Sequence, residues 1–137
     1  MKNNLSILLI EDDTIERMKF NRTIKKPGFN HNVIEAKNGE EALEFLNKKK
    51  NLPDIIILDL NMPRLNGIEF LKILKSDPVL KYIPSIILST SNNNLDILEC
   101  YKTGIAGYFI KPLKYEDYVT LINKIVSYWE TNQLAKN

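Results

Sequence analysis

The sequence predicts an α/β fold, a doubly wound five-stranded parallel sheet with five helices. Short apolar runs rich in Ile, Leu, Val and aromatic residues alternate along the chain with longer amphipathic segments. Apolar runs of this length suit strands that are buried on both faces of a parallel sheet. Strands that alternate with helices fold into such a sheet, with the helices covering its faces.

Five short segments have the composition of these strands. They are residues 5–10, 32–36, 54–58, 85–88 and 107–110. The second is the weakest, because its apolar stretch consists of Val33 and Ile34 alone. Right-handed crossovers leave few topologies for parallel strands, and periodicity alone does not fix their order.

The segments between the strands carry helix start and stop signals. An Asp or Asn followed three residues later by Glu predicts a first turn in which both side chains satisfy free amides. Three pairs fit this pattern: Asp13 with Glu16, Asn38 with Glu41, and Asn66 with Glu69. We expect the third helix to end near Ser76, because Pro78 disfavours helical geometry at Asp77.

Two further helices complete the alternation. The fourth fits residues 93–103 and is closed by Gly104, in the left-handed position that follows a helix. The fifth fits residues 115–130 and has an apolar stripe at helical spacing. The stripe consists of Tyr118, Leu121, Ile122, Ile125, Val126 and Trp129.

Length and composition indicate one domain, residues 5–130, followed by a polar C-terminal tail, residues 131–137. The net charge of +2 predicts no strong attraction to nucleic acid or to a membrane. The first apolar run is too short for a signal peptide or a membrane span, so we expect a cytoplasmic protein.

The single cysteine, Cys100, excludes an internal disulfide and is expected to be half-buried. The single histidine, His31, is expected to be an ordinary surface residue.

Polar side chains follow four of the five predicted strands. They are Glu11, Asp12 and Asp13 after the first, Asp59 after the third, Ser89 after the fourth and Lys111 after the fifth. Because the carboxyl ends of parallel strands meet at one edge of the sheet, we expect these side chains to converge. Asp13 alone would be a helix cap, and a lone lysine is usually solvated. The presence of carboxylates, a hydroxyl and a lysine at four strand ends together favours a functional site.

The predicted cluster has the donors of a metal-dependent phosphoryl site. Clustered carboxylates repel one another and need a cation to stay ionised together. All-oxygen ligands favour a hard ion such as Mg²⁺, which also takes phosphate oxygens. A hydroxyl and an ammonium suit the other oxygens of a phosphoryl group, and the Asp59 carboxylate can carry that group covalently.

Four segments of the chain resemble the receiver domains of two-component response regulators. They are LLIEDD at 8–13, DIIILDLNMPRLNG at 54–67, PSIILSTS at 84–91 and GYFIKPL at 107–113. The resemblance covers about residues 5–130. It implies the flavodoxin-like, CheY-like fold with strand order 2-1-3-4-5.

The resemblance also implies roles for the acidic residues. Asp59 matches the phosphoacceptor, Asp12 the direct metal ligand, and Glu11 the carboxylate that holds the metal through water. Asn61 matches the residue whose backbone carbonyl binds the metal. Asp13 could replace Asp12 as ligand, although counting back from the strand favours Glu11 and Asp12, with Asp13 as the cap.

Further positions match the residues that respond to phosphorylation in this family. Ser89 matches the hydroxyl that moves to the phosphoryl oxygen, and Lys111 matches the lysine that pairs with the acceptor and then with the phosphate. Tyr108 matches the aromatic residue whose ring turns inward on activation. Pro112 follows Lys111 through a bond that is cis in the family, which suits a tight turn.

The remaining matches are supporting residues. Pro63 and Gly67 match the loop that frames the acceptor. Asn61 and Ser91, each two residues beyond a site residue, match positions that tune self-dephosphorylation.

The function implied by the resemblance is a signalling switch and not an enzyme. A sensor histidine kinase or a histidine phosphotransfer protein donates the phosphoryl group to Asp59 in the presence of Mg²⁺. The face formed by the fourth helix, fifth strand and fifth helix then changes and acts on a downstream effector protein. Residues 77–91 resemble, more weakly, single-domain members found with phytochrome-type kinases, which often form homodimers through that face.

Two rival functions fit the sequence less well. A docking module that works without phosphorylation would have lost the site, yet every site position is filled. A Mg²⁺-dependent phosphatase of the haloacid dehalogenase class would need an Asp at position 61, where Asn61 stands.

Overall fold

The computed structural model describes residues 4–25, 30–62 and 64–135. Its strands are β1 (Ser6–Ile10), β2 (Asn32–Ala36), β3 (Ile55–Leu58), β4 (Ser85–Ser89) and β5 (Gly107–Ile110). Its helices are α1 (Thr14–Ile24), α2 (Gly39–Asn47), α3 (Gly67–Ser76), α4 (Asn94–Thr103) and α5 (Tyr115–Glu130), with a short 3₁₀ turn, Leu80–Tyr82, before β4. The predicted strands and helices are therefore all present.

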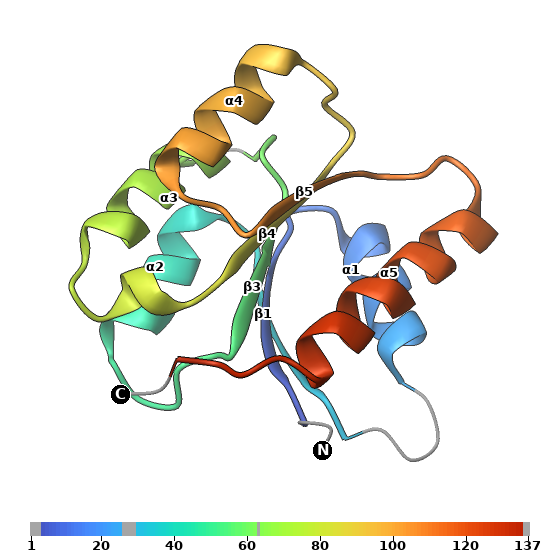
Figure 1. Ribbon diagram of the computed structural model, residues 1–137, viewed down its shortest axis with the longest axis horizontal. Coiled ribbons are helices and arrows are strands. Elements are labelled where there is room, and N and C mark those ends of the chain that lie inside the picture. Colours follow the sequence, from blue (N-terminus) through green and yellow to red (C-terminus); the bar gives the residue numbers. More distant parts are fainter. Residues whose placement is uncertain (1–3, 26–29, 63, 136–137) are drawn as a thin grey trace.

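All neighbouring strands pair in parallel, in the order β2-β1-β3-β4-β5. Helices α1 and α5 cover one face of the sheet, and α2, α3 and α4 cover the other (Figure 1). This is the doubly wound fold and the strand order that the resemblance implied. In this order β1 lies next to β3. From β1 the chain continues outward to β2 on one side, and from β3 it continues to β4 and β5 on the other.

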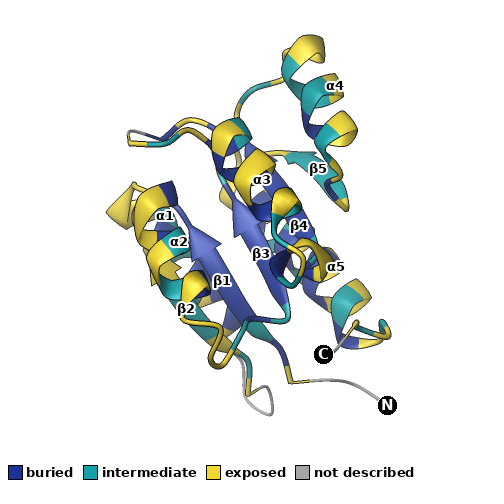
Figure 2. Ribbon diagram, turned by 90° about the vertical axis from the view of Figure 1, so that its left-hand side faces the viewer, coloured by how far each residue is buried: buried dark blue, intermediate teal, exposed yellow. Residues whose placement is uncertain are grey.

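The alternation of side chains along the strands divides the core in two. In β1, Leu8 and Ile10 face the α2–α3–α4 side, whereas Ile7 and Leu9 face the α1–α5 side. Both sets are buried, as predicted for a strand covered on both faces, and Figure 2 shows β1 and β3 as a buried layer between half-exposed helices. The two edge strands, β2 and β5, depart from this pattern, because both contain exposed and half-buried residues, among them Ile110 of β5, which is 44% exposed.

The helix ends follow the predicted signals, with two differences. Asp13, Asn38 and Asn66 cap α1, α2 and α3 through hydrogen bonds from first-turn amides. The reciprocal half of the expected box is wrong at Asp13, whose amide donates to Glu11 and not to Glu16, and at Asn38, because the Glu41 carboxylate accepts from the Lys37 amide. The Glu16 carboxylate is instead held by two lysine ammonium groups, which attract it more strongly than an amide does.

The later helices end as expected. Helix α3 stops at Ser76, before Pro78, and α4 is closed by Gly104 at φ 111°, a conformation that glycine adopts without steric cost. In the tail, Leu134 packs against the α1–α5 half of the core. Among the residues that the structure describes, no helix has both the length and the apolar character needed to cross a bilayer.

Two expectations about single residues are wrong. His31 is not an ordinary surface residue, because its side chain is 2% exposed and contacts Glu130. Cys100 is not half-buried but completely enclosed, on the face of α4 that packs against the sheet. The burial of both side chains was underestimated because it depends on elements that are distant in sequence.

Candidate functional site

The parallel pairing of the strands brings the acidic residues together at one edge of the sheet. The amide of Glu11 donates to Ala36 (3.0 Å) and that of Asp59 donates to Ile10 (3.1 Å), so the ladder continues one residue past the strand ends. As a result, one carboxylate oxygen from each of Glu11, Asp12 and Asp59 lies within 4.8 Å of the other two.

This carboxylate cluster has the composition of a divalent cation site. Three negative groups this close repel one another unless a cation lies between them. Oxygen-only ligands favour hard ions, and Asp12 is exposed, so an ion can reach the cluster from solvent. Burial raises the pKa of Glu11, although the nearby Lys111 opposes this effect.

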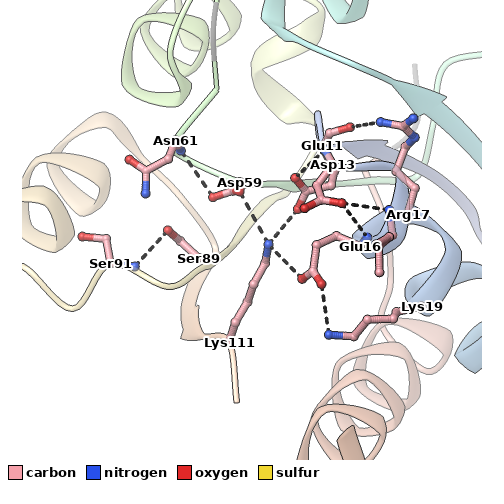
Figure 3. A network of polar contacts seen from close by, with 11 residues as sticks. Glu11, Asp13, Glu16, Arg17, Lys19, Asp59, Asn61, Ser89, Ser91 and Lys111 are labelled. Atoms are coloured by element: carbon pink, nitrogen blue, oxygen red, sulfur yellow. Dashed lines mark hydrogen bonds and ion pairs between the residues drawn. The ribbon is translucent and has the colours of Figure 1, made fainter. Parts of the chain in front are cut away.

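The ammonium of Lys111 lies among three carboxylates (Figure 3). Its Nζ is 2.7 Å from Glu11, 3.2 Å from Glu16 and 3.5 Å from Asp59. Burial opposes its charge, but the hydrogen bond to Glu11 and the neighbouring carboxylates raise the pKa of Lys111 overall. The lysine is therefore charged, and its closest partner is Glu11 and not Asp59.

The Glu16 carboxylate lies between two lysines. It contacts Lys111 through one oxygen and Lys19, at 3.0 Å, through the other. Burial alone would raise the pKa of Glu16, but the hydrogen bond from Lys19 and the charge of Lys111 lower it overall. The sequence pattern assigned Glu16 only to helix capping.

The loop after β3 holds the Asp59 carboxylate in place. The amide of Asn61 donates to Asp59 Oδ1 at 3.3 Å, and the amide of Gly67 donates to the Leu60 carbonyl. A Cβ atom at Gly67 would lie 2.8 Å from Leu60 Cα, so a side chain there would displace the residue next to Asp59. This agrees with a framing role for Gly67, whereas Pro63 lies outside the described residues.

The same loop contains two strained residues. Arg64 and Leu65 have φ of 51° and 66°, in the left-handed region. Each such non-glycine residue costs about 1–2 kcal/mol. The folded chain keeps this strained conformation in a loop that also frames the candidate site.

The β4 end of the site is linked to α4 and β5 by hydrogen bonds. Ser89 is fully buried, and its hydroxyl accepts a bond from the Ser91 amide at 3.2 Å. The Ser91 hydroxyl donates to Asp96 on α4 at 3.1 Å. The Tyr108 hydroxyl donates to the Ser91 carbonyl at 2.7 Å, and the Tyr108 ring packs against the α2–α3–α4 half of the core.

The expected cis bond before Pro112 is wrong. No peptide bond is cis within residues 4–25, 30–62 and 64–135. The amide of Lys111 donates to the Ser89 carbonyl at 2.8 Å, so the chain continues the β4–β5 ladder up to the proline. The Lys111–Pro112 peptide bond has the ordinary trans form, which is favoured by about 0.5–1 kcal/mol before proline.

Sequence reasoning missed Arg17. Its guanidinium is nearly buried, donates to the Glu11 carbonyl at 2.7 Å and pairs with Glu35 on β2 at 3.2 Å. The signal was present, because Arg17 shares the sheet-facing spacing of Phe20 and Ile24 on α1. An arginine at such a position must find partners for a buried charge.

Comparisons with known proteins agree with this geometry. The family model described as response regulator receiver domain matches residues 7–123. A probable methanogenesis regulatory protein, FilR2 of Methanothrix harundinacea, is 32% identical over 127 residues, which are 90% of this chain and 82% of that protein. The response regulator Rcp1 of Synechocystis is 31% identical over 128 residues, 90% of this chain and 87% of the relative.

Solved structures are similar over nearly the whole chain. The phosphorylated cyanobacterial phytochrome response regulator RcpA superposes with a TM-score of 0.92 at 31% identity, covering 98% of this chain and all of that one. The Mn²⁺-bound form of Rcp1 gives a TM-score of 0.90 at 30% identity, covering 96% of this chain and 99% of that one.

Proposed function

Because the chain belongs to the response regulator receiver domains, which are phosphorylation-dependent signalling proteins, we propose that Asp59 accepts its phosphoryl group. The observation that carries this proposal is the convergence of Glu11, Asp12 and Asp59 beside the Lys111 ammonium. The donor is a phosphohistidine of a sensor histidine kinase or of a histidine phosphotransfer protein.

The proposed metal is Mg²⁺. Asp12 and Asp59 would bind it directly, Glu11 through water, and Asn61 through its backbone carbonyl. Asp13 would not bind the metal, since its carboxylate already accepts hydrogen bonds from the first-turn amides of α1. When bound, Mg²⁺ would neutralise negative charge on the phosphoryl oxygens.

The transfer itself is a displacement at phosphorus. An oxygen of Asp59 forms the new P–O bond while the P–N bond to the donor imidazole breaks, and the imidazole leaves with that electron pair. The Asn61 amide fixes Oδ1, and the Lys111 ammonium lies 3.5 Å from Oδ2. The carboxylate is thus oriented before transfer, and positioning with electrostatic stabilisation supplies the catalysis.

The hydrogen bonds around Ser89 supply a route for the switch. The phosphoryl group adds negative charge and strong acceptors, which attract the Ser89 hydroxyl and Lys111. Movement of Ser89 toward those oxygens would change its hydrogen bond with the Ser91 amide, and Ser91 also contacts Asp96 and Tyr108. A change at Ser89 therefore alters the contacts of Tyr108, whose hydroxyl already bonds to the loop after β4.

The output surface that we propose is the α4–β5–α5 face. It carries exposed apolar side chains: Leu95, Leu98, Tyr101, Ile110 and Tyr128. A groove of about 460 Å³ between β5 and α5 is lined by residues that include Phe109, Leu121 and Trp129. A downstream effector protein would bind there, and a homodimer would use the same face.

The phosphoryl donor needs a second surface, next to Asp59. Ile15 and Met18 on α1 and Leu113 after β5 are large, apolar and exposed. Ile15 lies two residues from Asp13 and Leu113 two residues from Lys111, so they border the site. We propose that the donor protein docks on this border.

Phosphorylation by a small donor tests the proposal. Wild-type chain, Asp59→Asn and the control Asp117→Asn, an exposed residue of α5, are incubated with phosphoramidate with and without Mg²⁺. We expect one Mg²⁺-dependent acyl phosphate in the wild type and the control, detected by intact mass, and none in Asp59→Asn. Labelling that persists in Asp59→Asn would overturn the proposal, and effector binding that ignores Asp59 would favour the docking module.

A further inference from the structure

Glu16 occupies a position that the proposed chemistry leaves unexplained. It lies in the first turn of α1, on the side of the site opposite Ser89 (Figure 3). Its side chain is 22% exposed, and its carboxylate contacts the Lys111 ammonium at 3.2 Å. It is neither one of the three clustered carboxylates nor a cap, so its contact with the site lysine needs its own account.

The contacts of Lys111 define a competition. An ammonium has three N–H donors, and here it donates hydrogen bonds to Glu11 and Asp59 and forms an ion pair with Glu16. Glu11 and Glu16 lie closer to Nζ, at 2.7 and 3.2 Å, than Asp59 does, at 3.5 Å. A phosphoryl group on Asp59 would have to share the Lys111 ammonium with Glu11 and Glu16.

We propose that Glu16 is a positioning residue that holds Lys111 on the α1 side of the site and competes with the phosphoryl group for its ammonium. The inference rests on the proposed role of Asp59. Glu16 thereby lowers the affinity of the site for a phosphoryl group.

Lys19 sets how strongly Glu16 competes. Its Nζ is 3.0 Å from Glu16 and lies 4.5 Å from the ring centre of Tyr118 on α5. When Lys19 neutralises part of the Glu16 charge, Glu16 holds Lys111 less tightly. Removing Lys19 must therefore act in the opposite direction from removing the Glu16 charge, a sign pattern that a merely structural role does not produce.

The test is the binding of beryllofluoride, a phosphoryl mimic, at saturating Mg²⁺, followed by NMR of backbone amides. We expect Glu16→Gln to bind about threefold more tightly than the wild type, the range of a partly buried ion pair. Lys19→Met should bind about twofold more weakly for the same reason. Glu44→Gln, the same change on the exposed side of α2, should match the wild type.

Two further measurements separate contact from general charge. Glu16→Asp keeps the charge but shortens the side chain, so it should behave like Glu16→Gln if contact with Lys111 matters. In metal-free protein, the NMR signal of the Lys111 ammonium should shift in Glu16→Gln and stay unchanged in Glu44→Gln.

The outcomes are distinguishable from failure of the proposed function. If the wild type binds no beryllofluoride and takes no phosphoryl group, the role of Asp59 fails and this inference with it. If the wild type binds and Glu16→Gln binds equally or more weakly, only the role of Glu16 is overturned. Should Glu16→Gln not fold, Lys19→Met decides, and an unchanged or increased affinity there would reject the competition.

Discussion

The Nε2 atom of His31 lies 3.2 Å from Oε2 of Glu130, and the two side chains are 2% and 5% exposed. The other ring nitrogen, Nδ1, accepts a hydrogen bond from the Leu5 amide at 2.9 Å, so Nε2 carries the proton and donates it to the carboxylate. The pair joins the end of α5 to the beginnings of β1 and β2, at the sheet edge opposite the carboxylate cluster.

We expect His31→Ala to lower the free energy of unfolding by about 3 kcal/mol. It removes a hydrogen bond to a buried charge and leaves both the Glu130 carboxylate and the Leu5 amide without this partner. Urea denaturation of the wild type, His31→Ala and Glu116→Ala, an exposed position on the same helix, measures the effect. A loss in His31→Ala no larger than in Glu116→Ala would mean that the pair does not stabilise α5.

Metal binding should depend on Asp12 and not on Asp13. Mg²⁺ at about 100 times its dissociation constant should stabilise the wild type by about 2.7 kcal/mol. Asp12→Asn should lose most of this increment, because it removes one of the three clustered carboxylates. Asp13→Asn should keep it, because asparagine caps a helix as well as aspartate does.

Thermal unfolding with and without Mg²⁺ measures both increments, and chelation should return each protein to its metal-free stability. An increment lost in Asp13→Asn and kept in Asp12→Asn would reverse the assignment of the ligand.

Asp77 should make the stability of the chain depend on pH in the acid range. Hydrogen bonds from the Leu80 amide, Lys49 and the Val79 amide lower the pKa of Asp77 from 3.8 to about 2. The folded state therefore favours the ionised carboxylate, and its contribution is present above pH 3.8 and is lost as the pH falls through 2. Asp77→Asn should unfold at a denaturant concentration that varies less between pH 5 and pH 2 than the wild type does.

The local elements of this fold could be predicted because their signals are local. The end of α3 before Pro78, the Gly104 closure and the caps at Asp13 and Asn38 each depend on residues within one turn. The convergence of Asp12 with Asp59 also followed, because parallel pairing places all strand ends on one edge.

The parts that escaped prediction depend on partners far along the chain. His31 is buried by a residue 99 positions away, and the Lys111 contact that identifies the closest carboxylate spans 100 positions. A sequence pattern shows that Glu16 follows a cap by three residues, but only the folded sheet shows that the Lys111 side chain, after β5, reaches it. Residue type led to the proposed chemistry of the site, whereas the sharing of the Lys111 ammonium among three carboxylates was visible only in the structure.

Arg17 should couple the stability of α1 to metal binding. Its guanidinium bonds the Glu11 carbonyl at 2.7 Å, Glu35 at 3.2 Å and Thr14 at 3.1 Å, so it fixes the loop that carries Glu11 and Asp12. Arg17→Met should cost about 2 kcal/mol, since it removes charge-assisted bonds from a nearly buried position. It should also reduce the stabilisation by Mg²⁺, because the loop then pays an ordering cost on binding. Arg22→Met, on the exposed face of α1, is the matched control, and equal unfolding free energies and equal Mg²⁺ increments in the two variants would remove Arg17 from this role.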